Sequence, residues 1–142
     1  FFKKLGAFEV IEREKLNDQL GRTFQKETWA DAIDTVGGNT LATILGATKK
    51  FGVVLSIGLI SSTKLETTVY PFIARGVALQ SIASKEYSMF DRKNIWFKFA
   101  NGWKLDNFDN LIVNCDLNSL SITIDKIEKG DLQGRAIFNM LH

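Results

Sequence analysis

Residues 30–58 read ADAIDTVGGNTLATILGATKKFGVVLSIG, and this stretch determines the predicted fold class. Residues 30–36 favour a strand that ends at two glycines. Residues 52–58 are apolar at nearly every position and bounded by glycine, which is typical of a strand covered by helices on both faces. Between these strands, apolar residues recur at helical spacing from Leu41 to Thr48. The order strand, helix, strand predicts a right-handed βαβ unit and a parallel sheet.

The ends of the predicted helix follow from the residues that flank it. Asn39 or Thr40 is the expected N-cap, because either side chain can accept a hydrogen bond from the first backbone amides of the helix. Gly52 is the expected terminator. Beyond it, Pro71 starts a short helical segment, and residues 77–82 form the next predicted strand.

The two ends of the chain add further elements. Residues 1–6 have the pattern of a last helical turn closed by its glycine, and residues 8–11 alternate well enough for a short strand. Ser88 and Asp91 have capping-box spacing ahead of an amphipathic helix that ends near Gly102. The remaining predicted elements are a strand at 111–115, a helix at 117–127 closed by Gly130, and a strand at 136–140.

Composition limits the class of protein. The chain has 142 residues, with 18 Lys and Arg against 16 Asp and Glu, and therefore a formal net charge of +2. No basic stripe is present, so nucleic acid is not an expected partner. The single Cys115 excludes an internal disulfide and cysteine-based zinc motifs, and it fits a cytoplasmic protein. Residues 51–60, the longest apolar stretch, fall short of the roughly 20 residues of a membrane helix, so no membrane association is expected.

Ligands of open parallel α/β sheets bind beyond the carboxyl ends of the strands. In this sequence, those positions hold glycines and small polar residues. Glycine lets the backbone approach a ring or a sugar closely, although each of these glycines also fits ordinary turn chemistry. The positions are Gly37 and Gly38, Gly58 and Leu59, and Ala83 and Ser84. The fingerprint G-x-G-x-x-G and the phosphate loop G-x-x-x-x-G-K-[ST] are absent from the sequence.

Other side chains carry less functional information. The pairs Asp31/Asp34 and Asp106/Asp109 are expected to be solvated rather than to act as an acid and a base. His142 has no sequence partner and is expected to be an ordinary chain end. The aromatic residues of the helix after Ser88 are expected to pack it against a sheet; they are Trp96, Phe97, Phe99 and Trp103.

Two long runs carry a resemblance to a known family. They are WADAIDTVGG at 29–38 and TTVYPFIARGVALQ at 67–80. Both resemble the acryloyl-CoA reductase (NADPH) type of quinone oxidoreductase, a zinc-independent branch of the medium-chain dehydrogenase/reductase superfamily. The resemblance continues through residues 5–7, 103–106 and 130–135, and so extends over essentially the whole chain.

The resemblance implies an α/β fold in a carboxyl-terminal fragment of a two-domain enzyme. Residues 1–83 are then the latter part of a Rossmann nucleotide-binding domain, a doubly wound parallel sheet that is incomplete because it lacks its first strands. Residues 84–142 are the carboxyl-terminal return segment of the catalytic domain, which packs on a missing substrate domain. The glycine fingerprint and the groups that orient the substrate lie outside such a fragment, so the chain alone is expected to be inactive.

The resemblance also implies a reaction and a set of binding residues. The family transfers a hydride from NADPH to a short enoyl-CoA, such as acryloyl-CoA, or to a quinone-type acceptor, and uses no metal. No catalytic residue is implied for this chain. The implied cofactor-binding residues are Val36 and Gly37 on the adenosine or ribose side, Gly58, Leu59 and Ser84 at the nicotinamide, Arg135 at the phosphates, and Arg13 near the adenine or the 2′-phosphate. The sequence departs from the family's pattern at Ser81 and Ala83, close to Ser84.

A second function from a different class remains open. The chain is alternatively a non-catalytic nucleotide-binding and dimerisation remnant. In this superfamily the last Rossmann strand often pairs with its twofold mate, so the resemblance implies a homodimer through the edge strand from Val77 to Ile82. Turnover of an enoyl-CoA with NADPH by the natural protein distinguishes the enzyme from the remnant.

Overall fold

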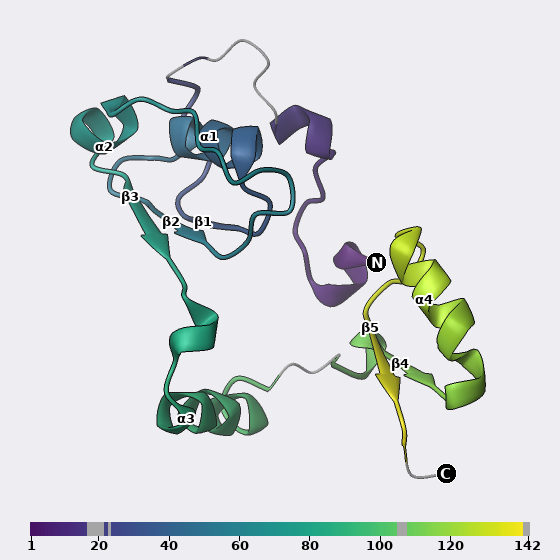
Figure 1. Ribbon diagram of the computed structural model, residues 1–142. Helices are drawn as coiled ribbons and strands as arrows, with labels where there is room; N and C mark the ends of the chain where they lie inside the picture. Colours follow the sequence, from purple (N-terminus) through teal and green to yellow (C-terminus); the bar gives the residue numbers. More distant parts are fainter. Residues whose placement is uncertain (17–21, 23, 105–107, 141–142) are drawn as a thin grey trace. The chain divides into compact units, whose positions relative to one another are not determined.

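A computed structural model describes residues 1–16, 22, 24–104 and 108–140 (Figure 1). The chain forms two compact units. One comprises Ile11–Tyr87 and is called the 11–87 unit here. The other combines Phe1–Val10 with the chain from Ser88 onward and is called the terminal unit. Each unit contains its own parallel sheet.

The 11–87 unit is built on a three-stranded parallel sheet. Its strands lie in the order β1-β2-β3, and the helices α1 and α2 connect them. This confirms the predicted α/β class and the alternation of strands with helices. The elements are β1 (Ala32–Asp34), α1 (Gly38–Ala47), β2 (Val53–Ser56), α2 (Tyr70–Arg75) and β3 (Ala78–Ser81), preceded by the 3₁₀ helix η2 (Arg13–Leu16).

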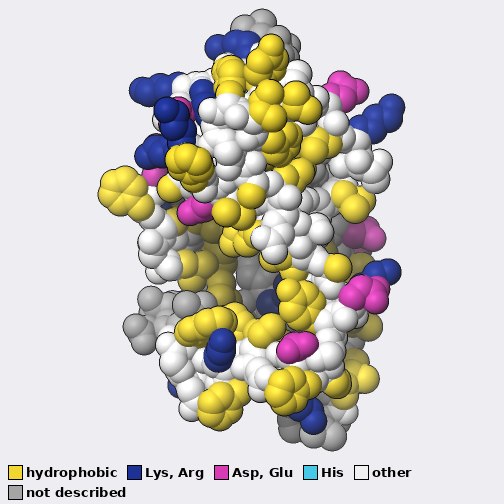
Figure 2. Space-filling view, turned by 90° about the vertical axis from the view of Figure 1, so that its left-hand side faces the viewer, with side chains coloured by type: hydrophobic (Ala, Val, Ile, Leu, Met, Phe, Trp, Pro, Cys, Tyr) yellow, Lys and Arg dark blue, Asp and Glu magenta, His cyan; other side chains and the backbone are white. Residues whose placement is uncertain are grey.

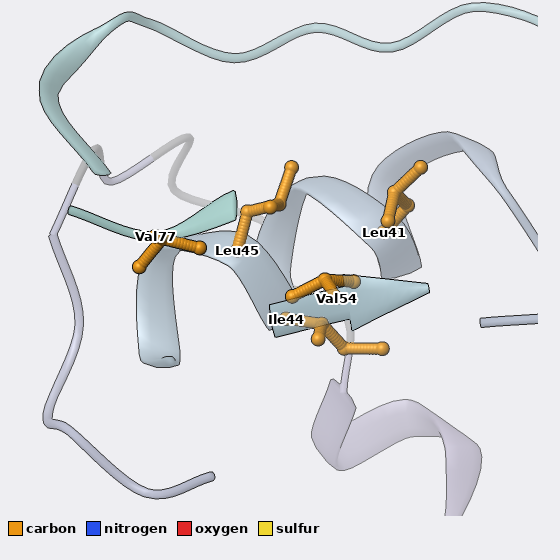
Figure 3. Packing of buried hydrophobic residues seen from close by; sticks show 5 residues of the cluster. All are labelled: Leu41, Ile44, Leu45, Val54 and Val77. Atoms are coloured by element: carbon orange, nitrogen blue, oxygen red, sulfur yellow. The ribbon is translucent and has the colours of Figure 1, made fainter. Parts of the chain in front are cut away.

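The core of the 11–87 unit lies between α1 and one face of the sheet (Figure 3). Leu45 and Val54 are completely buried. Trp29, Ala32 and Phe72 pack against this cluster from its edges. The cluster itself consists of Leu41, Ile44, Leu45, Val54 and Val77.

The prediction that both faces of the 52–58 strand are covered is wrong for the described residues. Two right-handed crossovers that proceed in the same direction place their helices on the same face of a sheet. The opposite face is therefore open, and Ile33 on it is 66% exposed. Val53 and Leu55 line a hollow on this face together with Asp31 and Ala32.

The ends of α1 differ from the prediction. Gly37 is the N-cap, instead of Asn39 or Thr40, and Thr48 is the C-cap, instead of Gly52. Gly52 serves a different purpose, because a Cβ atom there would overlap the carbonyl oxygen of Ala30. Close packing of chain on chain thus explains this glycine.

Arg75 ties the end of α2 to the end of α1. Its Nη1 donates to the carbonyl oxygens of Gly46 at 2.7 Å and Thr48 at 3.3 Å, and its Nη2 donates to the carbonyl of Gln25 at 2.9 Å. Its Nε lies 3.5 Å from a carboxylate oxygen of Glu27. The last carbonyls of a helix lack partners within the helix, so a cation is favourable there.

The terminal unit contains a two-stranded parallel sheet formed by β4 and β5. Residues 2–5 form a 3₁₀ turn closed by Gly6 in the left-handed conformation, as predicted. The predicted strand at 8–11 is wrong: alternation is a local signal, whereas a strand needs a neighbour, and Phe8 is 95% exposed. The elements are η1 (Phe2–Leu5), α3 (Met89–Ala100), β4 (Ile112–Cys115), α4 (Leu120–Glu128) and β5 (Arg135–Phe138).

Helix α3 begins as predicted, but its aromatic side chains do not pack it against a sheet formed by the described residues. The Oγ of Ser88 accepts a hydrogen bond from the Asp91 backbone amide at 3.1 Å. None of the α3 residues is buried. The rings of Trp96 and Phe99 lie 6.1 Å apart, and those of Phe99 and Trp103 lie 5.9 Å apart, so the aromatic residues contact one another along the helix.

Many large apolar side chains are exposed on the described surface. Figure 2 shows them spread over one face, among charged and other polar side chains. Within the described ranges, no helix is both long and apolar enough to cross a membrane.

Candidate functional site

The loops after β1 and β2 meet at the carboxyl end of the 11–87 sheet. The two strands are parallel neighbours, so both end at the same edge. Gly37 forms an isolated parallel bridge with Ser62, and the Ser61 amide donates to the Val36 carbonyl at 2.8 Å. Residues 57–62 therefore lie against the Val36-Gly37 turn, and we call the place where they meet the glycine junction.

Gly37 and Gly58 allow these loops to touch. A Cβ atom at Gly37 would lie 2.6 Å from the Ser62 carbonyl oxygen and 3.3 Å from the Leu59 Cα, and the φ of Gly37 is +74°. A Cβ atom at Gly58 would overlap the backbone of Thr35. Both glycines thus face protein backbone, and their function in the fold is to bring the two loops together.

Asp34 lies beneath this turn and is only 2% exposed. Its carboxylate accepts hydrogen bonds from two backbone amides: Val36 N lies 3.2 Å from Oδ1, and Gly37 N lies 3.2 Å from Oδ1 and 2.9 Å from Oδ2. The prediction that Asp34 is solvated is therefore wrong. Three residues earlier, Asp31 is exposed and accepts a bond from the Val53 amide at 2.8 Å.

Sequence reasoning could have found Asp34. An aspartate two or three residues before a glycine turn has the spacing of an Asx turn, in which the carboxylate accepts backbone amides just ahead of it. Its burial, in contrast, results from the packing of α1 and could not be read locally. Asp106 and His142 lie outside the described residues.

The structure brings together four of the predicted binding residues, namely Val36, Gly37, Gly58 and Leu59, at the glycine junction. Ser84 begins a short 3₁₀ turn three residues beyond β3, which is parallel to β2 and ends at the same edge. Arg13 is exposed in η2, which lies against α1.

Arg135 is the first residue of β5, in the terminal unit. It lines a hollow of about 580 Å³ within that unit. Gly134 beside it has a φ of +91°, and a Cβ atom there would overlap the carbonyl of Leu111. The other residues that line this hollow are Phe1, Phe2, Leu111, Gly130, Leu132, Gln133 and Gly134.

A polar hollow of about 470 Å³ adjoins the amino-terminal half of α1. No local sequence pattern predicts this hollow, because its lining comes from three segments that only the fold joins. These residues are Arg22, Gln25, Asn39, Ala42, Thr43, Glu66, Thr67 and Thr68. In the part of the chain that the structure describes, no three His, Cys, Asp or Glu residues are grouped so that they could hold a metal ion.

Known proteins with similar sequences identify the relatives of the chain. No protein-family model matches it. It is 32% identical over 140 residues to acrylyl-CoA reductase AcuI of Ruegeria pomeroyi and 33% identical over 141 residues to the putative quinone oxidoreductase YhfP of Bacillus subtilis. Each alignment includes 99% of this chain, but only 42% and 43% of the respective relative.

Solved structures of related oxidoreductases also match the chain. The crystal structure of Bacillus subtilis yhfP with NAD bound matches with a TM-score of 0.88 and 34% identity, over 97% of this chain and 42% of that one. The chain belongs to the medium-chain dehydrogenase/reductase superfamily. The crystal structure of the yhdH oxidoreductase of Salmonella enterica in complex with NADP matches the chain with a TM-score of 0.87 and 30% identity. This match covers 97% of this chain and 42% of that one.

These matches confirm the predicted family and fold. This superfamily member corresponds to a carboxyl-terminal portion of its relatives and contains part of a Rossmann-type parallel sheet. It spans less than half the length of the curated relatives that it matches. A cinnamyl alcohol dehydrogenase of Sorghum bicolor shares the fold alone, with 22% identity and a TM-score of 0.62. That match covers 79% of this chain and 30% of the dehydrogenase.

Proposed function

We propose that the chain supplies cofactor-binding residues to an NADPH-dependent oxidoreductase that transfers a hydride to a short enoyl-CoA, such as acryloyl-CoA, or to a quinone-type acceptor. The carrying observation is the glycine junction, where Val36-Gly37 and Gly58-Leu59 meet at the carboxyl end of a parallel sheet. Relatives of at least 30% identity support the nicotinamide cofactor, because two of them were solved with NAD and with NADP.

The residues present fit the uncharged parts of such a cofactor. The glycine junction consists of backbone and small or apolar side chains, which suit a flat nicotinamide ring and ribose hydroxyls. Val36 and Gly37 would hold the adenosine or ribose side, and Gly58, Leu59 and Ser84 would border the nicotinamide. When bound, the cofactor supplies the hydride that the β-carbon of the enoyl thioester receives.

Two arginines are the proposed partners of the cofactor phosphates. A guanidinium group pairs with phosphate oxygens through two parallel hydrogen bonds. We assign Arg135 to the diphosphate, and Arg13 to the adenine or the 2′-phosphate. Both arginines are exposed.

Titration of the 142-residue chain with NADPH, and in parallel with NADH, tests the proposal through the fluorescence of the reduced nicotinamide. We expect NADPH to bind, and Gly58→Ala to weaken binding because the new Cβ would overlap Thr35. Gly102→Ala is the matched control, since nothing lies within 4 Å of the added atom. Failure of the wild-type chain to bind either nucleotide contradicts the proposal.

An activity assay distinguishes the enzyme from a non-catalytic nucleotide-binding remnant. With NADPH and acryloyl-CoA, we expect no turnover from this chain alone, and turnover from a protein that also contains the remaining length of its relatives. Turnover by the chain alone would contradict our placement of the catalytic groups. Nucleotide binding without turnover by the longer protein would favour the remnant.

We also propose a homodimer through the edge strand from Val77 to Ile82. All four residues of β3 are exposed and β3 lies at the edge of its sheet, so its outer backbone groups are available for pairing. Leu79→Glu should give monomers in sedimentation velocity, whereas Leu120→Glu, at a leucine of similar exposure in α4, should not. An unchanged dimer in Leu79→Glu counts against this edge.

A cytoplasmic location is part of the proposal. Its support is the single, unpaired Cys115, which fits a reducing compartment.

A further inference from the structure

The buried carboxylate of Asp34 and the turn above it depend on each other. An ionised carboxylate leaves water at a large cost unless hydrogen bonds replace its hydration. The amides of Val36 and Gly37 provide such bonds at 2.9–3.2 Å. In return, the carboxylate fixes the direction of both N–H groups, in a segment that belongs to neither β1 nor α1.

This arrangement determines which part of a ligand the Val36-Gly37 turn can bind. Backbone amides just before a helix ordinarily offer an anion site, because their N–H groups and the helix dipole both favour negative charge. Here two of those amides already donate to Asp34, and the carboxylate adds a negative charge beside α1. A phosphate at this turn would therefore meet charge repulsion, and the amides of Val36 and Gly37 could not donate to it.

We infer that Asp34 is a positioning residue: it holds the Val36-Gly37 turn in place and reserves this side of the glycine junction for an uncharged nucleoside part of the cofactor, while the phosphates bind elsewhere. This inference rests on the proposed function. Asp34 acts through the turn and does not itself touch the cofactor.

Asp31 is the matched control within the same segment. It is the same residue type, and it also accepts a backbone amide, from Val53. It is exposed, and it precedes β1, whereas Asp34 is the last residue of β1. Substitution of Asp31 therefore tests the loss of one carboxylate bond without disturbing the turn.

The test compares the wild-type chain with Asp34→Asn and Asp31→Asn. Amide hydrogen exchange at Val36 and Gly37 is followed by NMR, and the same samples are titrated with NADPH and with inorganic pyrophosphate. We expect Asp34→Asn to speed exchange at both amides at least tenfold, to weaken NADPH binding at least tenfold and to strengthen pyrophosphate binding. Asp31→Asn should change none of the three.

The outcomes separate this inference from the proposed function. If the wild-type chain binds no NADPH, the proposed function fails, and amide exchange and pyrophosphate binding still decide the role of Asp34. Wild-type exchange at Val36 and Gly37 as fast as in an unfolded chain would overturn the inference without any variant, even if Asp34→Asn does not fold. Unchanged exchange, or unchanged NADPH and pyrophosphate binding, in a folded Asp34→Asn would overturn it as well.

Discussion

The two units contain the same motif with very different burial. In the 11–87 unit, β1, α1 and β2 form a parallel strand-helix-strand motif, and β4, α4 and β5 form another in the terminal unit. Most residues of α1 are buried, whereas Thr123 is the single buried residue of α4. The motif therefore follows from local sequence pattern, while its burial depends on what else the fold places against the helix.

The largest expected effect concerns the helices themselves. Leu45 is completely buried in α1, so Leu45→Ala removes packed methyl groups and leaves a cavity, at a cost of about 3–5 kcal/mol in the free energy of unfolding. Ile122 in α4 is 61% exposed, and Ile122→Ala should cost less than about 1 kcal/mol. Urea unfolding followed by circular dichroism measures both. Equal losses of unfolding free energy in the two variants would contradict the difference in burial between α1 and α4.

The two units also differ in what a cationic side chain contributes, as a comparison of Arg75 with Lys98 shows. Its side chain is 13% exposed, and its bonds to the carbonyls of Gly46, Thr48 and Gln25 leave unpaired acceptors when it is removed. Arg75→Ala should cost about 2–3 kcal/mol in the free energy of unfolding. In the terminal unit, Lys98 lies over the Trp103 ring at 4.8 Å, and Lys98→Ala should cost below about 1 kcal/mol.

Arg75→Lys separates geometry from charge in this prediction. An ammonium group cannot reproduce the planar set of donors that reaches three carbonyls, so this variant should recover only part of the loss. Full recovery would show that charge alone matters at this position, and a cost as small as that of Lys98→Ala would contradict the role of Arg75 as a tie between helices.

The same contrast explains what could be predicted from sequence. Residues 30–58 predicted β1, α1 and β2 because apolar periodicity and glycine boundaries are local signals. The N-cap shifted to Gly37 because contact with Ser62 fixes the backbone there, and no local signal contains that contact. Residues 8–11 failed as a strand for the same reason, since alternation does not supply a neighbour.

The candidate site divides in the same way. The glycines of the glycine junction could be predicted because they follow strands, and parallel strands end at the same edge of a sheet. The burial of Asp34 could not be predicted, because it results from the packing of α1 on the sheet. Long-range packing, rather than propensity, decides which carboxylate becomes structural.

A smaller effect is expected at Phe51, in the turn before β2. Its φ is +63°, a conformation that strains a bulky side chain, and the residue is 83% exposed. Phe51→Gly should raise the free energy of unfolding by about 0.5–1 kcal/mol, because relief of strain outweighs the added chain entropy. Phe8→Gly, at an exposed phenylalanine of the terminal unit, should give no gain in thermal unfolding.

The smallest effect concerns the two carboxylates that precede the crossover helices. Asp34 before α1 is buried, whereas Asp116 before α4 is exposed and accepts the Ser119 amide at 2.9 Å. Hydrogen bonds from the side chain and the backbone of Ser119 lower the pKa of Asp116. A lowered pKa stabilises the fold above the unfolded pKa, and this contribution is lost as pH falls through the folded value.

Asp116→Asn should therefore make stability less sensitive to acid. The drop in the urea midpoint between pH 7 and about pH 3 should be slightly smaller than in the wild type, with Asp125→Asn in α4 as the control, because the carboxylate that loses its advantage in acid is gone. A drop as large as in the wild type would mean that the exposed cap contributes nothing measurable. The acid sensitivity of the chain would then belong to other carboxylates.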